Sequence, residues 1–134
     1  MVTHAYKNHF QNDMDESVRV ELKQRGCRIV TAAHALSAGE RSISMTYRGV
    51  YPLELAAQIL RMFGSGTKVA AECALMAVSS GDLEGGAPCV AVGGSVKGAD
   101  TAWILTPSVG LLDLKFNELL CKPALYDENS EIFR

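Results

Sequence analysis

The stretch APCVAVGGSVKGADTAWILTP, residues 87–107, holds two short apolar runs separated by a glycine-rich segment. The runs at residues 89–92 and 101–105 have the composition of buried strands. The segment at residues 93–100 carries three glycines, one lysine and one aspartate. Because glycine tolerates positive φ angles, such a segment can turn several backbone N–H groups towards one anion. We therefore predict two strands joined by a loop that is able to bind an anion.

Strands and helices alternate along the rest of the chain. Residues 33–50 are predicted to form a long irregular segment, tied down by its apolar side chains, that covers a site or a subunit contact. The order predicts one α/β domain, a three-layer α/β/α sandwich with a mixed, mainly parallel sheet, over residues 1–134. We predict further strands at residues 1–6, 27–32 and 114–121, and helices at residues 13–25, 52–63 and 67–79.

The predicted helix at residues 67–79 is made almost entirely of small and apolar residues. Lys68 and Glu72 are its only charged side chains. A helix of this composition is mostly buried, and its alanines allow a close approach to a sheet or to a partner subunit. Thr67 is predicted to cap its beginning.

The composition is that of an ordinary water-soluble domain. The chain has 134 residues, of which 48% are hydrophobic and 21% charged, and its net charge is −2. This charge gives no electrostatic reason to expect a nucleic acid or an anionic membrane as partner. No apolar run approaches the roughly 18–20 residues of a membrane helix, and no secretory signal is recognisable. We therefore expect a cytoplasmic protein with no nucleic-acid or membrane partner.

The four cysteines lie far apart in apolar surroundings, and no two form a Cys-x-x-Cys pair. The three histidines add no spacing that is typical of a metal site. We expect no bound metal, and we interpret the cysteines as small buried apolar side chains. They are Cys27, Cys73, Cys89 and Cys121.

Two glycine motifs fail the tests for nucleotide binding. The sequence GSGTK at residues 64–68 lacks both the Gly-Lys-Thr order and the upstream glycine of a phosphate-binding P-loop. The glycines at residues 93–98 precede a predicted strand, whereas the dinucleotide fingerprint requires a helix at that point. An ordinary turn between strands therefore remains an alternative to the anion-binding loop.

Two histidines lie at or just after the ends of predicted strands. His34, together with Ser37, comes directly after the strand at residues 27–32, and His4 lies near the end of the first strand. Ligands bind outside the carboxyl ends of strands in open α/β sheets. Each histidine is therefore either a ligand contact or a purely structural side chain.

Five segments taken together resemble a known family. They are VTH at 2–4, AHALS at 33–37, GVYP at 49–52, KVAAE at 68–72 and GGSVKGADTA at 93–102. The chain is similar over most of its length to stand-alone prokaryotic proteins related to the C-terminal α/β domain of pyruvate kinase. In pyruvate kinase this domain holds the allosteric sugar-phosphate site and has no catalytic residues, so the resemblance argues against pyruvate kinase activity.

The resemblance implies a phosphorylated ligand, and flavin mononucleotide (FMN) is the cofactor we expect first. The glycine loop would hold the phosphate, while residues at the ends of neighbouring strands would approach the rest of the ligand. We also expect a homo-oligomer. The expected ligand-binding residues are Thr3, His4, His34, Gly93, Gly94, Ser95, Lys97, Gly98, Asp100 and Thr101.

Members of this family carry one more strand–helix unit before the Val-Thr-His strand, and its final turn supplies half of the phosphate site. The present sequence begins at the second strand of that pattern, so we expect an N-terminally incomplete domain with a sheet edge left uncovered. The alternative hypothesis is a non-catalytic regulatory or oligomerisation subunit that has lost its ligand and associates through the helix at 68–79. A flavin-dependent oxidoreductase is the last alternative.

Overall fold

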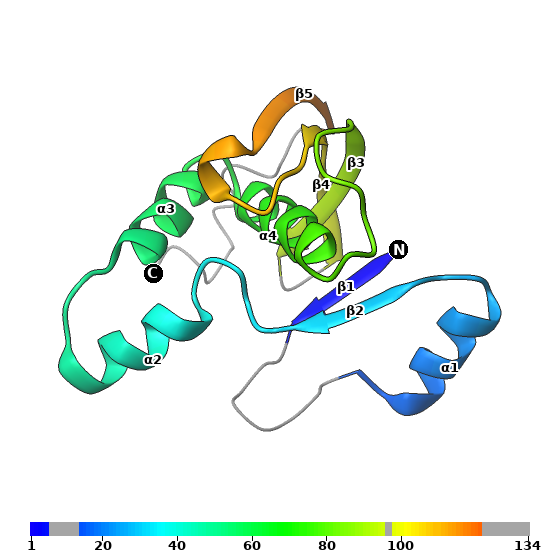
Figure 1. Cartoon of the computed structure of the whole chain (residues 1–134), viewed down its shortest axis with the longest axis horizontal. Helices are drawn as coiled ribbons and strands as arrows, with labels where there is room; N and C mark the ends of the chain where they lie inside the picture. The colour runs from blue at the N-terminus through cyan, green and yellow to red at the C-terminus, as the bar shows by residue number, and fades with distance from the viewer. Residues whose placement is uncertain (6–13, 96–97, 122–134) are drawn as a thin grey trace.

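The computed structural model describes residues 1–5, 14–95 and 98–121, and these residues form helices and strands in alternation (Figure 1). The chain therefore belongs to the α/β class, as predicted. In chain order the elements are β1 (Val2–Ala5), α1 (Glu16–Gln24), β2 (Ile29–Ala32), α2 (Ala38–Tyr47), α3 (Pro52–Arg61), α4 (Ser65–Ser79), β3 (Cys89–Ser95), β4 (Gly98–Thr106), the 3-10 turn η1 (Leu111–Asp113) and β5 (Lys115–Cys121).

The strands form two sheets, so the prediction of one mixed, mainly parallel sheet is wrong. β1 and β2 pair in parallel, whereas β3, β4 and β5 form a separate antiparallel sheet. β3 ends at Ser95 and β4 begins at Gly98. A connection this short can join only antiparallel strands, because a parallel pair needs a crossover of a dozen or more residues. The predicted loop at residues 93–100 is therefore mostly strand.

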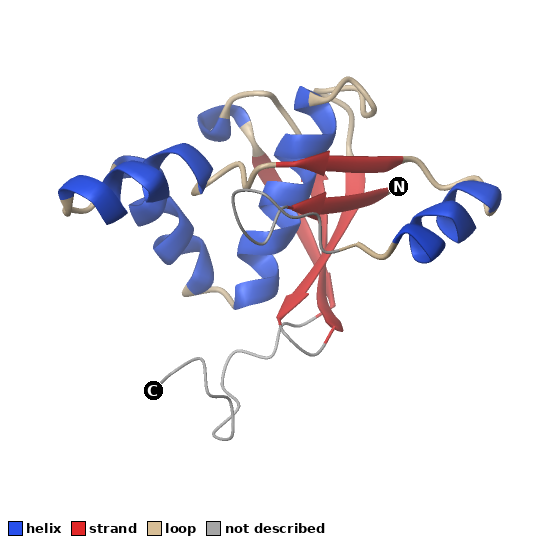
Figure 2. Cartoon of the chain, turned by 90° about the horizontal axis from the view of Figure 1, so that it is seen from below, coloured by secondary structure: helices blue, strands red, loops and turns tan. Residues whose placement is uncertain are grey.

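Helix α4 lies at the centre of the molecule and packs against both sheets and against α3 (Figure 1). Seen from below, the two strands of the first sheet run across the view while those of the second run down it (Figure 2). The described helices therefore do not enclose one continuous sheet, and the predicted three-layer sandwich is not formed.

The core of the second sheet is built on the small side chains of α4. Ala70 and Ala74 of α4 are buried together with Ala91 of β3 and Leu105 of β4. The prediction of a buried helix is confirmed. Its use as a subunit contact stays a prediction, to which Ala74 does not contribute because it is only 3% exposed within a single chain.

Helix α2 is an element that the sequence analysis missed, because residues 33–50 were expected to be irregular. Its large apolar side chains are not tied down. Ile43, Met45 and Tyr47 are 45%, 70% and 77% exposed. The helix is held instead by polar contacts to α3, since a Glu40 carboxylate oxygen accepts hydrogen bonds from the backbone nitrogens of Leu53 at 2.7 Å and Glu54 at 3.1 Å.

The remaining predicted elements are present with shifted ends. α1 begins after Asp15, whose carboxylate accepts hydrogen bonds from the Ser17 nitrogen at 2.8 Å and its hydroxyl at 2.7 Å. These two hydrogen bonds lower the pKa of Asp15. Residue Asp13, where the sequence predicts this helix to begin, lies outside the described residues. α3 and β5 lie where the sequence predicts them.

Candidate functional site

Side chains of the second sheet lie against the N-terminal end of α4. The helix begins after Gly64, whose φ is 98°, and no side chain caps it. The first backbone N–H groups of any helix lack partners within the helix, and the helix dipole makes this end partly positive. Such an end is suited to bind an anion. It was not predicted as a site, because GSGTK failed as a P-loop.

The β3–β4 hairpin lies directly against this end of α4. A Cβ atom on Gly66 would lie 2.6 Å from Thr101 Cβ and 2.5 Å from an Asp100 carboxylate oxygen. A Cβ atom on Gly93 would lie 2.7 Å from the Ala70 nitrogen. Gly93 therefore allows α4 to pack closely against β3. This role differs from the predicted one, in which Gly93 is part of a loop that binds an anion.

Asp100 and Thr101 are predicted site residues that lie at the beginning of α4. Thr101 is buried, with 1% of the residue exposed. Its hydroxyl donates a hydrogen bond to an Asp100 carboxylate oxygen at 2.6 Å. Because this carboxylate lies beside Gly66, it places an acceptor at the positive end of the helix. Asp100 can therefore accept a hydrogen bond from a ligand but would repel a phosphate in direct contact.

Thr67 does not cap α4 as predicted but lies within its first turn. Its hydroxyl donates to the Phe63 carbonyl oxygen at 2.8 Å and accepts from the Trp103 indole nitrogen at 3.0 Å. Trp103 in turn meets Phe116 of β5 edge-to-face, with ring centroids 5.1 Å apart. This chain of contacts fixes the hairpin on the start of the helix.

His34 belongs to a network of charged side chains on the other side of α4. Its Nδ1 atom lies 3.2 Å from a Glu72 carboxylate oxygen, and the Lys68 ammonium donates to the same oxygen. The second Glu72 oxygen accepts from the Leu36 backbone nitrogen at 3.2 Å. Lys68 and Glu72 are buried, whereas the His34 side chain is 42% exposed. The network therefore presents an oriented imidazole at the surface.

The charge state of Glu72 follows from these contacts. Burial raises the pKa of the carboxyl, but the hydrogen bonds from His34 and Lys68 outweigh this effect and the pKa is lowered. Glu72 is therefore ionised at neutral pH. An ionised carboxylate on Nδ1 orients the imidazole and turns its Nε2 atom away from Glu72, where it can donate to or accept from a ligand.

The predicted residues on β1 point to different faces of the first sheet. The Thr3 hydroxyl donates to the Cys73 carbonyl oxygen of α4 at 3.5 Å. Side chains alternate along a strand, so His4 faces away from α4, beside its register partner Thr31. Its Nδ1 atom is buried and has no hydrogen-bond partner among the described residues. The structure does not bring His4 to the α4 site.

The other predicted residues lie in the hairpin or outside the description. Gly94 closes on the opposite strand, because a Cβ atom there would lie 2.7 Å from Ala99 Cα, and Gly98 has a φ of 113°. Lys97 and the side chain of Ser95 lie outside the described part of the structure. Ser37 precedes α2 without a side-chain capping bond.

Lys68 and Glu72 are the site residues that the sequence analysis missed. Their spacing of four residues in an otherwise apolar helix was the available signal, because two charges buried on one helix face need each other or a third partner. The sequence does not show that His34 is this third partner, because the two segments meet only in the folded chain.

The predictions about membrane helices, metal sites and cysteines can be compared with the described residues. Within residues 1–5, 14–95 and 98–121, no helix is long and apolar enough to span a bilayer, and no cluster of His, Cys, Asp or Glu has the arrangement of a metal site. Cys121 is exposed, so the prediction that all four cysteines are buried is wrong.

A comparison with protein families finds no family model that matches this chain.

Proposed function

We propose that this protein binds a phosphorylated small molecule at the N-terminal end of α4, with FMN as the first candidate. The observation that carries the proposal is that predicted site residues contact this helix, which no side chain caps. Asp100 and Thr101 lie beside its first turn, and His34 is held by Glu72 two turns further along.

Each group has a defined part in the proposed complex. The N–H groups at the beginning of α4 hold the phosphate, as in other helix N-termini that bind anions. Asp100 accepts a hydrogen bond from a ligand hydroxyl, and Thr101 keeps the carboxylate oriented. The exposed edge of the His34 ring supplies a further polar contact. The proposal assigns no reaction to the site.

Comparing FMN with riboflavin tests the phosphate contact directly, because the two differ only in that group. We expect FMN to bind at least about tenfold more tightly, which corresponds to about 1.4 kcal/mol. Flavin fluorescence measured during titration with the purified protein gives both dissociation constants. Equal affinity for the two flavins would contradict phosphate recognition. A protein that binds neither FMN nor a sugar bisphosphate would contradict the proposal as a whole.

A variant at the start of α4 tests the location. Ser65→Asp adds a carboxylate beside the first N–H groups of the helix, where it competes with a phosphate for the same donors. We expect this variant to lose the preference for FMN over riboflavin. Ser65→Asn is the matched uncharged control and should retain the preference. A Ser65→Asp protein that still prefers FMN would place the phosphate elsewhere.

We also propose self-association as a second function, on a surface different from the one expected at first. Met45, Tyr47 and Met62 of the α2–α3 region are at least 70% exposed. Large apolar side chains with this exposure are a feature of interaction sites. Light scattering should show an oligomer that Met62→Glu dissociates. A wild-type protein that is monomeric at all concentrations would contradict this proposal.

A further inference from the structure

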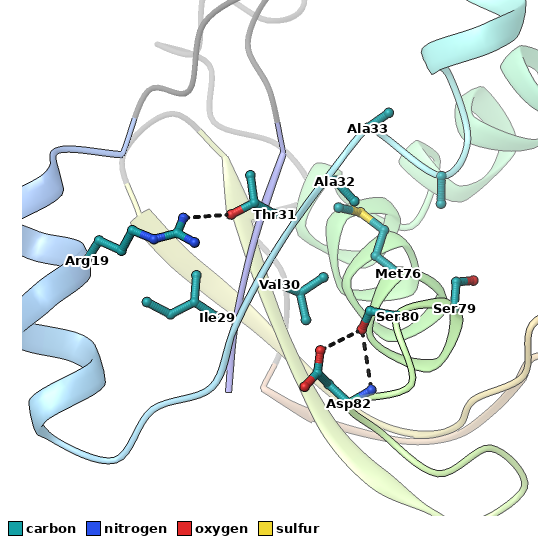
Figure 3. Close-up of a pocket in the computed structure, with 11 residues that line it drawn as sticks. Arg19, Ile29, Val30, Thr31, Ala32, Ala33, Met76, Ser79, Ser80 and Asp82 are labelled. Carbon is teal, nitrogen blue, oxygen red and sulfur yellow. Dashed lines mark hydrogen bonds between the residues drawn. The ribbon is translucent and has the colours of Figure 1, made fainter.

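The free edge of β2 borders a groove that the α4 site does not use (Figure 3). β2 pairs with β1 along one edge, and no strand among the described residues covers its other edge. The groove encloses about 510 Å³ and is lined by every residue of β2. An uncovered strand edge offers a row of backbone N–H and C=O groups for pairing with another chain.

The two walls of this groove come from different helices. On one face of β2, Arg19 of α1 extends beside Ile29 and Thr31, and its Nη1 atom donates to the Thr31 hydroxyl at 3.3 Å (Figure 3). On the other face, Val30 points towards Met76 at the C-terminal part of α4. The groove therefore extends along both faces of β2.

The walls carry opposite charges. The first has the Arg19 guanidinium, and the second has the carboxylate of Asp82, which follows α4. The Ser80 hydroxyl lies 2.9 Å from an Asp82 carboxylate oxygen, and Arg28 donates to the Asp82 backbone oxygen at 3.0 Å. These bonds hold the turn after α4, and with it the acidic wall, in place.

We propose that an extended peptide binds in this groove and pairs with β2 as an added strand. Successive side chains of a strand point to opposite faces, so the peptide would present acidic side chains to Arg19 and apolar or basic side chains to Val30 and Asp82. The pattern that fits is an alternation of glutamate with valine or lysine. Backbone pairing supplies affinity, and the two oppositely charged walls supply selectivity.

The charges favour a peptide partner over a second copy of this chain. Two copies paired antiparallel through β2 would share the same two faces. Arg19 would then lie beside its own symmetry mate on one face, and Asp82 beside its own on the other. Like charges placed opposite each other in a sheet are destabilising. A heterologous peptide with the complementary alternation avoids this repulsion.

Two short peptides with exchanged charges test the proposal. The first probe is acetyl-EVEKEVT-amide, which places glutamates on one face and lysine between valines on the other. The second is acetyl-KVKEKVT-amide, in which the charges are reversed. Fluorescence anisotropy with labelled peptides at low salt should show at least about tenfold tighter binding of the first by the wild-type protein, because the second sets like charges against both walls.

Charge-reversal variants of the protein complete the design. Arg19→Glu should abolish the preference, and Arg19→Glu with Asp82→Lys should reverse it in favour of the second peptide. Arg41→Glu, an exposed position in α2 outside the groove, is the matched control and should behave like the wild type. Circular dichroism of each variant verifies that it is folded.

A main-chain control separates strand addition from simple charge attraction. The first peptide with N-methyl groups on alternate amides along its pairing edge keeps every charge but loses donors to β2, and we expect at least about tenfold weaker binding. Equal binding of the methylated peptide, or of the two unmethylated peptides, would overturn the proposal, as would no binding of either by the wild type. A mixed dimer of wild-type and Arg19→Glu chains, tighter than either homodimer, would assign the edge to a second copy.

Discussion

Gly66 lies in a close contact between α4 and the second sheet. A Cβ atom at this position would lie 2.6 Å from Thr101 Cβ, a distance that real Cβ contacts essentially never show. Gly39 is the natural comparison, because it also lies in a helix but nothing approaches its position within 4 Å. The two glycines separate the effect of packing from the effect of helix propensity.

We expect Gly66→Ala and Gly39→Ala to change stability in opposite directions. Alanine is favoured over glycine in a helix by up to about 1 kcal/mol, so Gly39→Ala should stabilise the fold. Gly66→Ala should destabilise it by about 1–3 kcal/mol, because α4 must move away from Thr101. Urea unfolding measures both free energies. Stabilisation by both substitutions would contradict the contact between α4 and β4.

The lowered pKa of Glu72 makes the stability of the fold depend on pH. The folded chain binds the Glu72 proton more weakly than the unfolded chain, so the ionised carboxylate stabilises the fold above its ordinary pKa of 4.5. This contribution is lost progressively as the pH falls below that value. We expect the free energy of unfolding to decline more steeply with acid in the wild type than in Glu72→Gln.

Urea unfolding at pH values from 7 down to about 2 measures this difference, because the loss falls below pH 4.5. Glu72→Gln should also be less stable at neutral pH, because it leaves the buried Lys68 ammonium without a carboxylate partner. Identical pH profiles for the two proteins would show that the carboxyl is not held ionised by His34 and Lys68.

The cysteines should differ in their reactivity towards iodoacetamide. Burial raises the pKa of the Cys73 thiol, and the charge of Glu72 raises it further, whereas Cys121 is exposed on β5. Because the thiolate is the reactive form, Cys121 should be modified first and Cys73 last. Peptide mass spectrometry after timed labelling gives the order. Early modification of Cys73 in the folded protein would contradict the packing of α4.

The candidate site was only partly predictable from single residues. The position of His34 after a predicted strand made it a candidate, and the structure places it in a polar contact with Glu72, while its contact with a ligand stays a prediction. The same argument selected His4, but side-chain alternation in β1 turns His4 away from α4, so the structure does not support its place beside that helix. The partners Lys68 and Glu72 depend on a contact across 38 residues of sequence, which spacing alone does not reveal.

Among the helices, α2 and α3 depend on each other. Glu40 lies in the first turn of α2, and its carboxylate accepts from two backbone nitrogens in the first turn of α3. Ser44 adds a hydrogen bond of 2.7 Å from its hydroxyl to Glu54. Sequence analysis missed this link between α2 and α3, because capping residues are sought next to the helix that they cap, whereas Glu40 caps a helix that begins twelve positions later.

We expect Glu40→Ala to destabilise the protein by about 1–2 kcal/mol, the usual effect of removing a helix cap. Glu40→Gln should cost less, because the amide oxygen can still accept a hydrogen bond but lacks the charge that favours the positive end of α3. Thermal unfolding followed by circular dichroism compares the two variants. Equal stability of Glu40→Ala and the wild type would show that α2 and α3 are independent.

At the scale of the whole molecule, the sequence predicted the class and most of the elements but not their pairing. The alternation of strands and helices is visible in hydrophobic patterns, whereas strand order depends on contacts between distant segments. The hairpin was the decisive case. Its glycines predicted a loop, but the pairing of β3 with β4 continues to Ser95 and Gly98. Gly93 is needed because α4 packs closely against it.

This arrangement predicts how local stability is distributed, because nearly every contact between the two sheets passes through α4. Ten of its residues are buried, whereas α1 has no buried residue and packs mainly on β2 among the described elements. Local opening costs least where few apolar contacts must be broken. We therefore expect the backbone amides of α4 to exchange with solvent most slowly, those of β3 and β4 next, and those of α1 fastest.

Hydrogen exchange followed by mass spectrometry measures this order. Protection of α1 equal to that of α4 would mean that α1 is covered by a contact that the described residues do not provide, and protection of α4 no higher than that of β5 would contradict its central place in the fold.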